Sequence, residues 1–138
     1  MTRTIGLDFG EKRIGVSVSD PLGLMAFGGG VIENKGDDSI VSQLKVLFEK
    51  YGDVGELVVG LPLNLKGEKG IQAQKVQKFI DLLRDNFDVP INTFDERMTT
   101  AGSTRKLLEA GLNTKNIRSV IDEASAMSIL QDYLDTKK

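Results

Sequence analysis

Two consecutive segments near the N-terminus alternate strictly between apolar and small or polar residues. The apolar side chains occupy the odd positions of residues 5–9 and the even positions of residues 14–18. Successive side chains of a strand point to opposite faces of a sheet, so each segment predicts a strand with one buried face. Between them, Gly10-Glu11-Lys12 predicts a tight hairpin turn, with the glycine available for a positive φ. An antiparallel hairpin therefore opens the fold.

The rest of the chain predicts one more strand and then an alternation of helices and strands. The third strand is expected over Leu24–Ile32, where Gly28-Gly29-Gly30 indicates a bulge or bend. Three leading strands followed by crossovers predict an α/β fold with a mixed sheet, antiparallel first and parallel afterwards, in a single domain over residues 1–138. The later predicted elements are a helix capped by Asp37, Asp38 or Ser39, a strand over Glu56–Leu61, a helix over Gly70–Phe87, a strand over Pro90–Phe94, a helix from Thr99 or Thr100 to Gly111, and a helix over Ser119–Leu134.

Composition removes several classes of site. The chain has no cysteine and no histidine, which excludes disulfides, zinc held by either residue, and the Ser-His-Asp and Cys-His nucleophile pairs. The hydrolytic designs that remain depend on carboxylates. A net charge of −2 provides no overall basic field, so nucleic-acid binding would need a local basic patch. We see no signal-peptide pattern and no apolar run of membrane-spanning length, and we expect a cytoplasmic protein without membrane contact.

Three acidic residues stand where apolar segments meet polar sequence: Asp8, Glu96 and Asp122. Asp8 and Glu96 follow predicted strands, whose carboxyl ends gather at one edge of such a sheet. If Asp122 is added from the last helix, three carboxylates form an oxygen cage for Mg²⁺ or Mn²⁺. Asp95 could serve in place of Glu96, whereas Ser19-Asp20-Pro21 is typical of a turn.

Small residues give a second reason to expect Asp122 near Asp8. One face of the first hairpin and one segment of the last helix are both small, which permits close approach of helix to sheet. The residues concerned are Gly6, Gly15 and Ser17 on the strands and Ala124, Ser125, Ala126 and Ser128 on the helix.

Several short motifs are spread, in order, over nearly the whole chain. They are Gly6-Leu7-Asp8-Phe9-Gly10, Lys12-Arg13-Ile14-Gly15-Val16, Ser19-Asp20, Val59-Gly60-Leu61-Pro62-Leu63-Asn64, Asp95-Glu96-Arg97-Met98-Thr99-Thr100, Ile121-Asp122, Ile129-Leu130-Gln131 and Tyr133-Leu134. Together these motifs resemble the YqgF family of the ribonuclease H-like superfamily, whose members are described both as Holliday junction resolvase-like proteins and as ribosomal-RNA maturation nucleases. Ser103 and Ser125 depart from the alanines usual in the family, and residues 113–119 are less basic than in many relatives.

The resemblance implies a ribonuclease H-like sheet of order 3-2-1-4-5 flanked by helices, and metal-dependent hydrolysis of phosphodiester bonds. It implies that Asp8, Glu96 and Asp122 are the catalytic metal ligands of two Mg²⁺ or Mn²⁺ ions, with Asp8 bridging both. Candidate substrate-binding residues are Arg13, Asn64 and Arg97; the two arginines could hold phosphates or could form surface ion pairs. The favoured substrate is the 5′ end of the pre-16S ribosomal RNA, with ribosomal particles as possible partners.

Three other interpretations remain. A four-way DNA junction is the alternative substrate, although a junction resolvase needs a symmetric dimer and the sequence marks no dimer interface. A phosphate-binding hairpin of the actin, Hsp70 and sugar-kinase superfamily could resemble Asp8-Phe9-Gly10, but those proteins clamp nucleotide between two such domains. A non-catalytic nucleic-acid-binding or transcription-associated module would have to keep three mutually repelling carboxylates without a metal.

Overall fold

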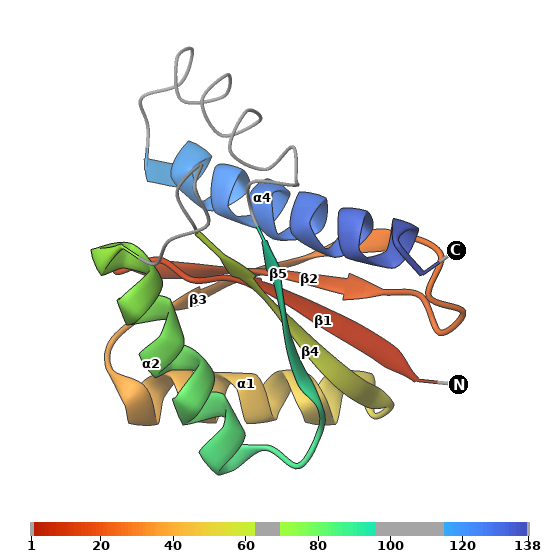
Figure 1. Cartoon of the computed structure of the whole chain (residues 1–138), viewed down its shortest axis with the longest axis horizontal. Coiled ribbons are helices and arrows are strands. Elements are labelled where there is room, and N and C mark those ends of the chain that lie inside the picture. The colour runs from red at the N-terminus through yellow and green to blue at the C-terminus, as the bar shows by residue number, and fades with distance from the viewer. Residues whose placement is uncertain (1, 63–69, 96–114, 138) are drawn as a thin grey trace.

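The computed structural model describes residues 2–62, 70–95 and 115–137. Its strands form one sheet in the order β3-β2-β1-β4-β5, in which β1 pairs antiparallel to β2, β2 antiparallel to β3, and β4 parallel to both β1 and β5. The predicted mixed sheet and its strand order are confirmed (Figure 1). The elements are β1 (Arg3–Asp8), β2 (Arg13–Ser19), β3 (Ala26–Glu33), α1 (Asp37–Tyr51), β4 (Val54–Leu61), α2 (Ile71–Asn86), β5 (Ile91–Asp95) and α4 (Lys115–Asp135).

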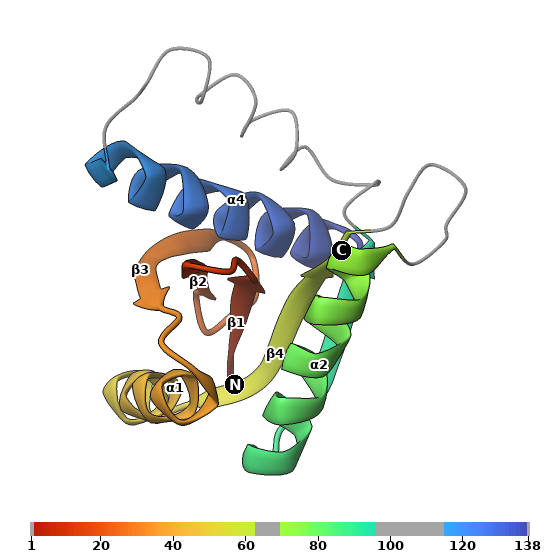
Figure 2. The ribbon, with the colours of Figure 1, turned by 90° about the vertical axis from the view of Figure 1, so that its left-hand side faces the viewer.

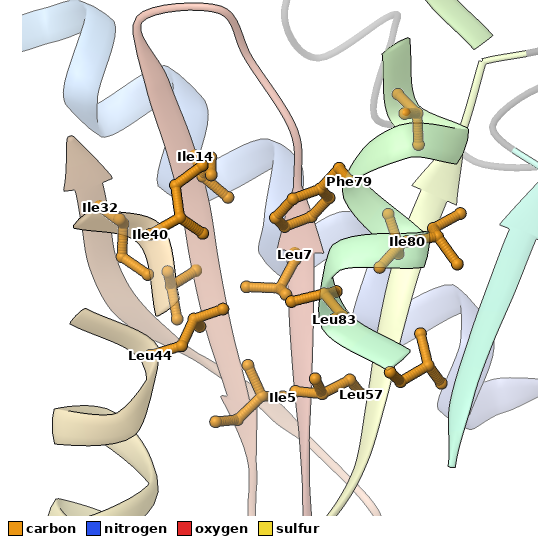
Figure 3. Packing of buried hydrophobic residues seen from close by; sticks show 14 of the residues in the cluster. Ile5, Leu7, Ile14, Ile32, Ile40, Leu44, Leu57, Phe79, Ile80 and Leu83 are labelled. Atoms are coloured by element: carbon orange, nitrogen blue, oxygen red, sulfur yellow. The ribbon is translucent and has the colours of Figure 1, made fainter. Parts of the chain in front are cut away.

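The helices cover the two faces of the sheet unequally. Helices α1 and α2 lie on one face, and α4 runs across the other (Figure 2). The main apolar core lies between the sheet and α1 and α2, and it contains the odd-numbered residues of β1 and the even-numbered residues of β2 (Figure 3). That division follows the predicted alternation. A second cluster, which includes Ile129 and Leu130, packs α4 against the opposite face.

The predicted hairpin is present, but its turn does not use the positive φ that a glycine makes available. Gly10 is not among the glycines with positive φ. A Cβ atom at Gly10 would lie 2.3 Å from the carbonyl oxygen of Arg13, so glycine is needed there because of close backbone approach rather than backbone twist. The predicted bend in β3 is present: the β2–β3 register shifts between Gly15 and Ser17, and Gly30 has φ 84°.

The start of α1 also differs from the prediction. The N-cap is Gly36, with φ 110° and no side-chain capping bond, and not Asp37, Asp38 or Ser39. A positive φ at the cap favours glycine over any of these. Asp37 and Asp38 lie in the first turn instead, where their charges interact favourably with the helix dipole. The predicted helix from Thr99 or Thr100 to Gly111 lies outside the described residues.

Helix α4 lies directly on the small face of the hairpin. A Cβ atom at Gly15 would come within 1.9 Å of the carbonyl oxygen of Asp122, and one at Gly6 within 2.8 Å of Leu130 Cβ. The Ser17 hydroxyl donates a hydrogen bond to the Ala126 carbonyl oxygen at 2.8 Å. The predicted close contact between helix and sheet is confirmed. None of the helices in the described part of the chain combines the length and hydropathy needed to span a bilayer.

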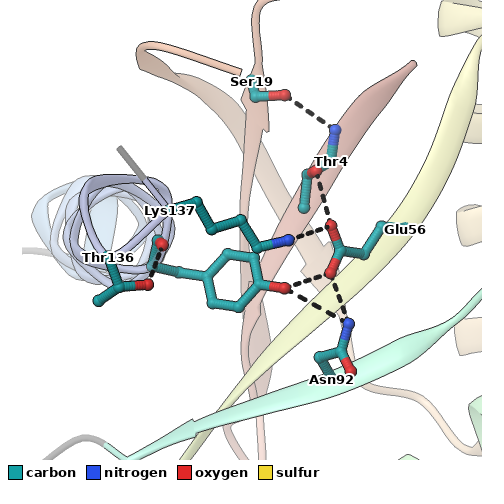
Figure 4. Close-up of polar contacts among 7 residues, drawn as sticks. Thr4, Ser19, Glu56, Asn92, Thr136 and Lys137 are labelled. Carbon is teal, nitrogen blue, oxygen red and sulfur yellow. Dashed lines mark hydrogen bonds and ion pairs between the residues drawn. The ribbon is translucent and has the colours of Figure 1, made fainter. Parts of the chain in front are cut away.

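The C-terminal end of α4 is held by a polar cluster around Glu56 at the start of β4 (Figure 4). The Glu56 carboxylate accepts hydrogen bonds from the Tyr133 hydroxyl, the Asn92 side-chain amide and the Thr4 hydroxyl. The Nζ atom of Lys137 lies 3.5 Å from Oε1 of Glu56. Burial alone would raise the pKa of Glu56, but these donors and the lysine charge outweigh it and the pKa falls below its ordinary value. Burial, followed by the bond to the carboxylate, raises the pKa of Tyr133.

Substituting Gly15→Ala should force α4 away from β2. Because backbone lies where the new methyl group would go, we expect the free energy of unfolding to fall by about 1–3 kcal/mol, the usual cost of overpacking. Chemical denaturation measures this. Gly70→Ala is the control, since a Cβ there meets nothing within 4 Å. Equal losses in the two variants would contradict the packing described.

Substituting Glu56→Gln should destabilise the protein in a pH-dependent way. A lowered folded-state pKa contributes stability that is complete above the ordinary value of 4.5 and is lost as pH falls through the folded value. We expect a deficit of about 1–3 kcal/mol near neutral pH, from hydrogen bonds to a charged group, that shrinks in acid. Urea unfolding across this range tests it, with the exposed Glu49→Gln as control. A deficit that stays constant with pH would contradict the account.

Candidate active site

The candidate site lies at the edge of the sheet where the parallel strands end. Strands β1, β4 and β5 run in the same direction and end at Asp8, Leu61 and Asp95. Sites in sheets of this type gather outside the carboxyl ends of the strands. Asp8 and Asp95, the last residues of β1 and β5, therefore lie at a common edge.

The structure brings Asp8 and Asp122 to the same end and face of the hairpin. Asp8 is the register partner of Gly15, and the backbone of Asp122 passes directly over Gly15. Asp8 shares the sheet face of Gly6, which α4 covers. Asp122 is only 8% exposed, so its carboxylate is held close to the protein and not in open solvent.

Arg13 supplies the positive charge next to Asp122. Its Nε donates to Oδ2 of Asp122 at 2.9 Å, and the side chains are 19% and 11% exposed. Arg13, at the start of β2, lies on the same face as Gly15, so one strand provides both the cation and the space for the helix. The predicted phosphate-binding role of Arg13 stays a prediction. In this structure its partner is a carboxylate.

Three of the predicted site residues, Asn64, Glu96 and Arg97, lie outside the described residues. Within residues 2–62, 70–95 and 115–137, no three acidic side chains gather closely enough to hold a metal ion. Asp8 and Asp122 account for two of the three predicted ligands, and β5 ends one residue before Glu96. Asp95, the alternative ligand, is partly buried at the end of β5 and pairs in register with Leu61.

Two acidic residues near the site have structural roles. Glu123, which belongs to none of the motifs above, accepts a hydrogen bond from the backbone N–H of Gly30 at 2.6 Å and lies against Gly28. This bond connects α4 to the bulge of β3. In the sequence, only the position of Glu123 next to Asp122 could have pointed to it. Asp20 accepts hydrogen bonds from the backbone N–H groups of Leu24 and Met25, which confirms the predicted turn. The hydrogen bond from the Met25 N–H has the largest effect on the pKa of Asp20 and lowers it.

Solved structures place the fold in a known class. RuvC from Thermus thermophilus in complex with a Holliday junction substrate matches 96% of this chain and 92% of its own, with a TM-score of 0.57 and 13% identity. A second Thermus thermophilus RuvC structure matches 99% of this chain and 96% of its own, with a TM-score of 0.57 and 11% identity. At these identities the likeness shows the fold alone, which is ribonuclease H-like.

The sequence then gives the family. The model of the RuvX family, described as Holliday junction resolvase, matches residues 2–136, and the chain belongs to this family. A relative from Clostridium acetobutylicum, named "Putative pre-16S rRNA nuclease", is 42% identical over 134 residues, or 97% of this chain and 98% of the relative. One of the same name from Halothermothrix orenii is 42% identical over 96% of this chain and 94% of its own. The predicted family resemblance is confirmed.

Ser125, one turn after Asp122, carries a buried hydroxyl without a partner among the described residues. It is 1% exposed. Since an unsatisfied buried donor is costly, Ser125→Ala should raise the free energy of unfolding by about 1 kcal/mol. Thermal or urea unfolding measures this, with the partly buried Ser128→Ala expected to change stability by less than about 0.5 kcal/mol. A loss of stability in Ser125→Ala would show that the hydroxyl has a partner in solution.

Proposed function

We propose that this chain is a metal-dependent nuclease whose ligand set is Asp8, Asp122 and Glu96. The observation that carries the proposal is the seating of the Asp122 backbone over Gly15, the register partner of Asp8. It supports the proposal because the backbones of Asp8 and Asp122 lie at the same end of the hairpin, in a chain that has no histidine or cysteine to serve as a ligand.

The described residues fit a hard divalent cation. Carboxylate oxygens are the ligands that Mg²⁺ and Mn²⁺ prefer, and Glu96 would complete the set from the residue after β5. Bound divalent ions would supply a nucleophile at neutral pH and offset the charge that develops on the departing oxygen. We propose two such ions.

The protein's own groups would position the substrate. The Arg13 guanidinium is held beside Asp122 at the mouth of the site, and its planar set of donors matches a phosphate as well as a carboxylate. Arg13 would contact a substrate phosphate there, with Asn64 and Arg97 as further contacts. The tight seating of α4 would keep Asp122 in place, which matters because misplacement by about 1 Å can cost about 100-fold in rate.

We propose the 5′ end of the pre-16S ribosomal RNA as the substrate and the cytoplasm as the location, on the strength of the relatives' name. Ribosomal particles would then present the substrate. The second candidate is the four-way DNA junction, which the family description favours. Since a junction needs two cuts placed by symmetry, the oligomeric state on junction DNA separates the two.

Asp8→Asn should remove metal-dependent cleavage while the protein stays folded. We expect the rate to fall by more than about 100-fold, since even residues that only orient metal ligands account for about 10- to 100-fold. The assay uses a pre-16S RNA fragment and a four-way DNA junction, each with Mn²⁺, Mg²⁺ or EDTA.

Asp85→Asn, an exposed change of the same kind on α2, is the control and should cleave normally. Cleavage that survives Asp8→Asn, or that persists in EDTA, would contradict the proposed site. Cleavage of the junction but not of the RNA would keep the site and overturn the substrate.

A further inference from the structure

A pocket opens at the same edge of the sheet on the face opposite Asp122. It has a volume of about 340 Å³, and its apolar wall consists of Phe9, Ile40, Phe79 and Leu82. The rings of Phe9 and Phe79 have centroids 4.9 Å apart, and Phe79 lies beside the first hairpin (Figure 3). Phe79 is only 3% exposed, so the partly buried Phe9 provides the aromatic surface that a ligand can reach. We call this the hairpin pocket. Its volume lies at the small end of ligand pockets, which span about 300–1,000 Å³.

The hairpin pocket is adjacent to the candidate active site in sequence and in space. Phe9 directly follows Asp8, so the two residues lie on opposite faces of one strand end. A second, open hollow of about 580 Å³ includes Arg13, Lys12 and Lys35 and reaches Ser119 on α4. Glu11 and Asn34 line both hollows. The surface is therefore continuous from the Arg13–Asp122 pair, around the hairpin, to the hairpin pocket.

Ammonium groups border this surface. Lys75 pairs with Glu11 across the pocket, but both side chains are about half exposed, and ion pairs so exposed contribute little. Lys35 pairs with Glu33. Within the described part of the chain, Lys12 and Lys78 have no carboxylate within ion-pair distance. Two lysines are thus available to an anion: Lys78 lines the hairpin pocket, and Lys12 lines the neighbouring hollow.

An aromatic wall bordered by lysines has the chemistry of a single-stranded nucleic-acid site. Bases stack on aromatic side chains while the basic rim follows the backbone phosphates. The pocket's volume exceeds that of a single base, and a base that stacks on a side chain must first leave its own helical stack. The acidic Glu11 and Asp37 at the same rim disfavour a ligand that is only a phosphate.

We propose that the hairpin pocket binds one unpaired nucleobase of the substrate strand, while Lys12 and Lys78 contact the phosphates on either side. The proposal rests on the proposed nuclease function, and it adds a requirement for a single-stranded nucleotide beside the scissile bond. A fully paired duplex could not place a base in the pocket.

The test measures binding in EDTA, so that no strand is cut. The full chain is titrated into a fluorescent single-stranded RNA oligonucleotide of fixed sequence that carries one abasic site, moved along the strand in successive probes. When the abasic site falls at the position whose base would stack in the pocket, binding should weaken about 5- to 100-fold. Lys78→Glu should weaken binding of the unmodified strand about tenfold and reduce the dependence on salt. Arg84→Glu, exposed on the same helix and outside the pocket, should change it by less than about twofold.

Equal affinity for all abasic probes, equal effects of Lys78→Glu and Arg84→Glu, or no binding of single strands would each overturn the pocket assignment. So would a nucleoside monophosphate that binds as tightly as the strand. None of these results bears on cleavage, which the Asp8→Asn assay decides separately. If the protein cleaves its substrate but no position of the abasic site weakens binding, the nuclease function stands and the pocket assignment fails. If one position weakens binding but no cleavage occurs, the pocket assignment stands and the nuclease function fails.

Discussion

The contact between Gly15 and the backbone of Asp122 is the constraint on which the candidate site depends. No other residue would let α4 lie this close to β2, because the first atom of any side chain would overlap the Asp122 carbonyl group. The contact sets the height of the helix above the sheet and, with it, the position of Asp122 relative to Asp8. A glycine at the centre of a strand usually weakens it. Here that cost is offset by the approach of a helix that carries an acidic residue.

The same helix is held at both ends by polar groups. Near its start, Arg13 and the bulge of β3 hold Asp122 and Glu123, and near its end the Glu56 cluster holds Tyr133 and Lys137. The opposite face of the sheet relies on apolar packing with α1 and α2. The faces are thus specialised: one supplies most of the core, and the other holds Asp122 in place. At the carboxyl edge, where the faces meet, the first hairpin separates the candidate site from the hairpin pocket.

Much of this could be predicted from the sequence, because alternation and small residues act locally. The odd and even apolar positions of the hairpin gave the buried face, and Gly6, Gly15 and Ser17 indicated where a helix could approach. The N-cap of α1 was predicted wrongly, and Gly10 does not take a positive φ. Whether a glycine serves close approach or a positive φ depends on backbone contacts that the sequence does not record. The Glu56–Tyr133 bond joins residues 77 positions apart, and the hairpin pocket joins three elements, so neither has a local pattern. The roles of Asn64, Glu96 and Arg97 stay predictions.

We propose that Asp8 and Asp122 hold divalent cations together, and anomalous diffraction from crystals soaked in Mn²⁺ tests this without recourse to activity. Anomalous density is expected between the two carboxylates, with the Arg13 guanidinium displaced from Asp122 or shared with it. Density only at other acidic residues, with the Arg13–Asp122 pair intact and the Asp8 carboxylate turned away, would contradict the claim.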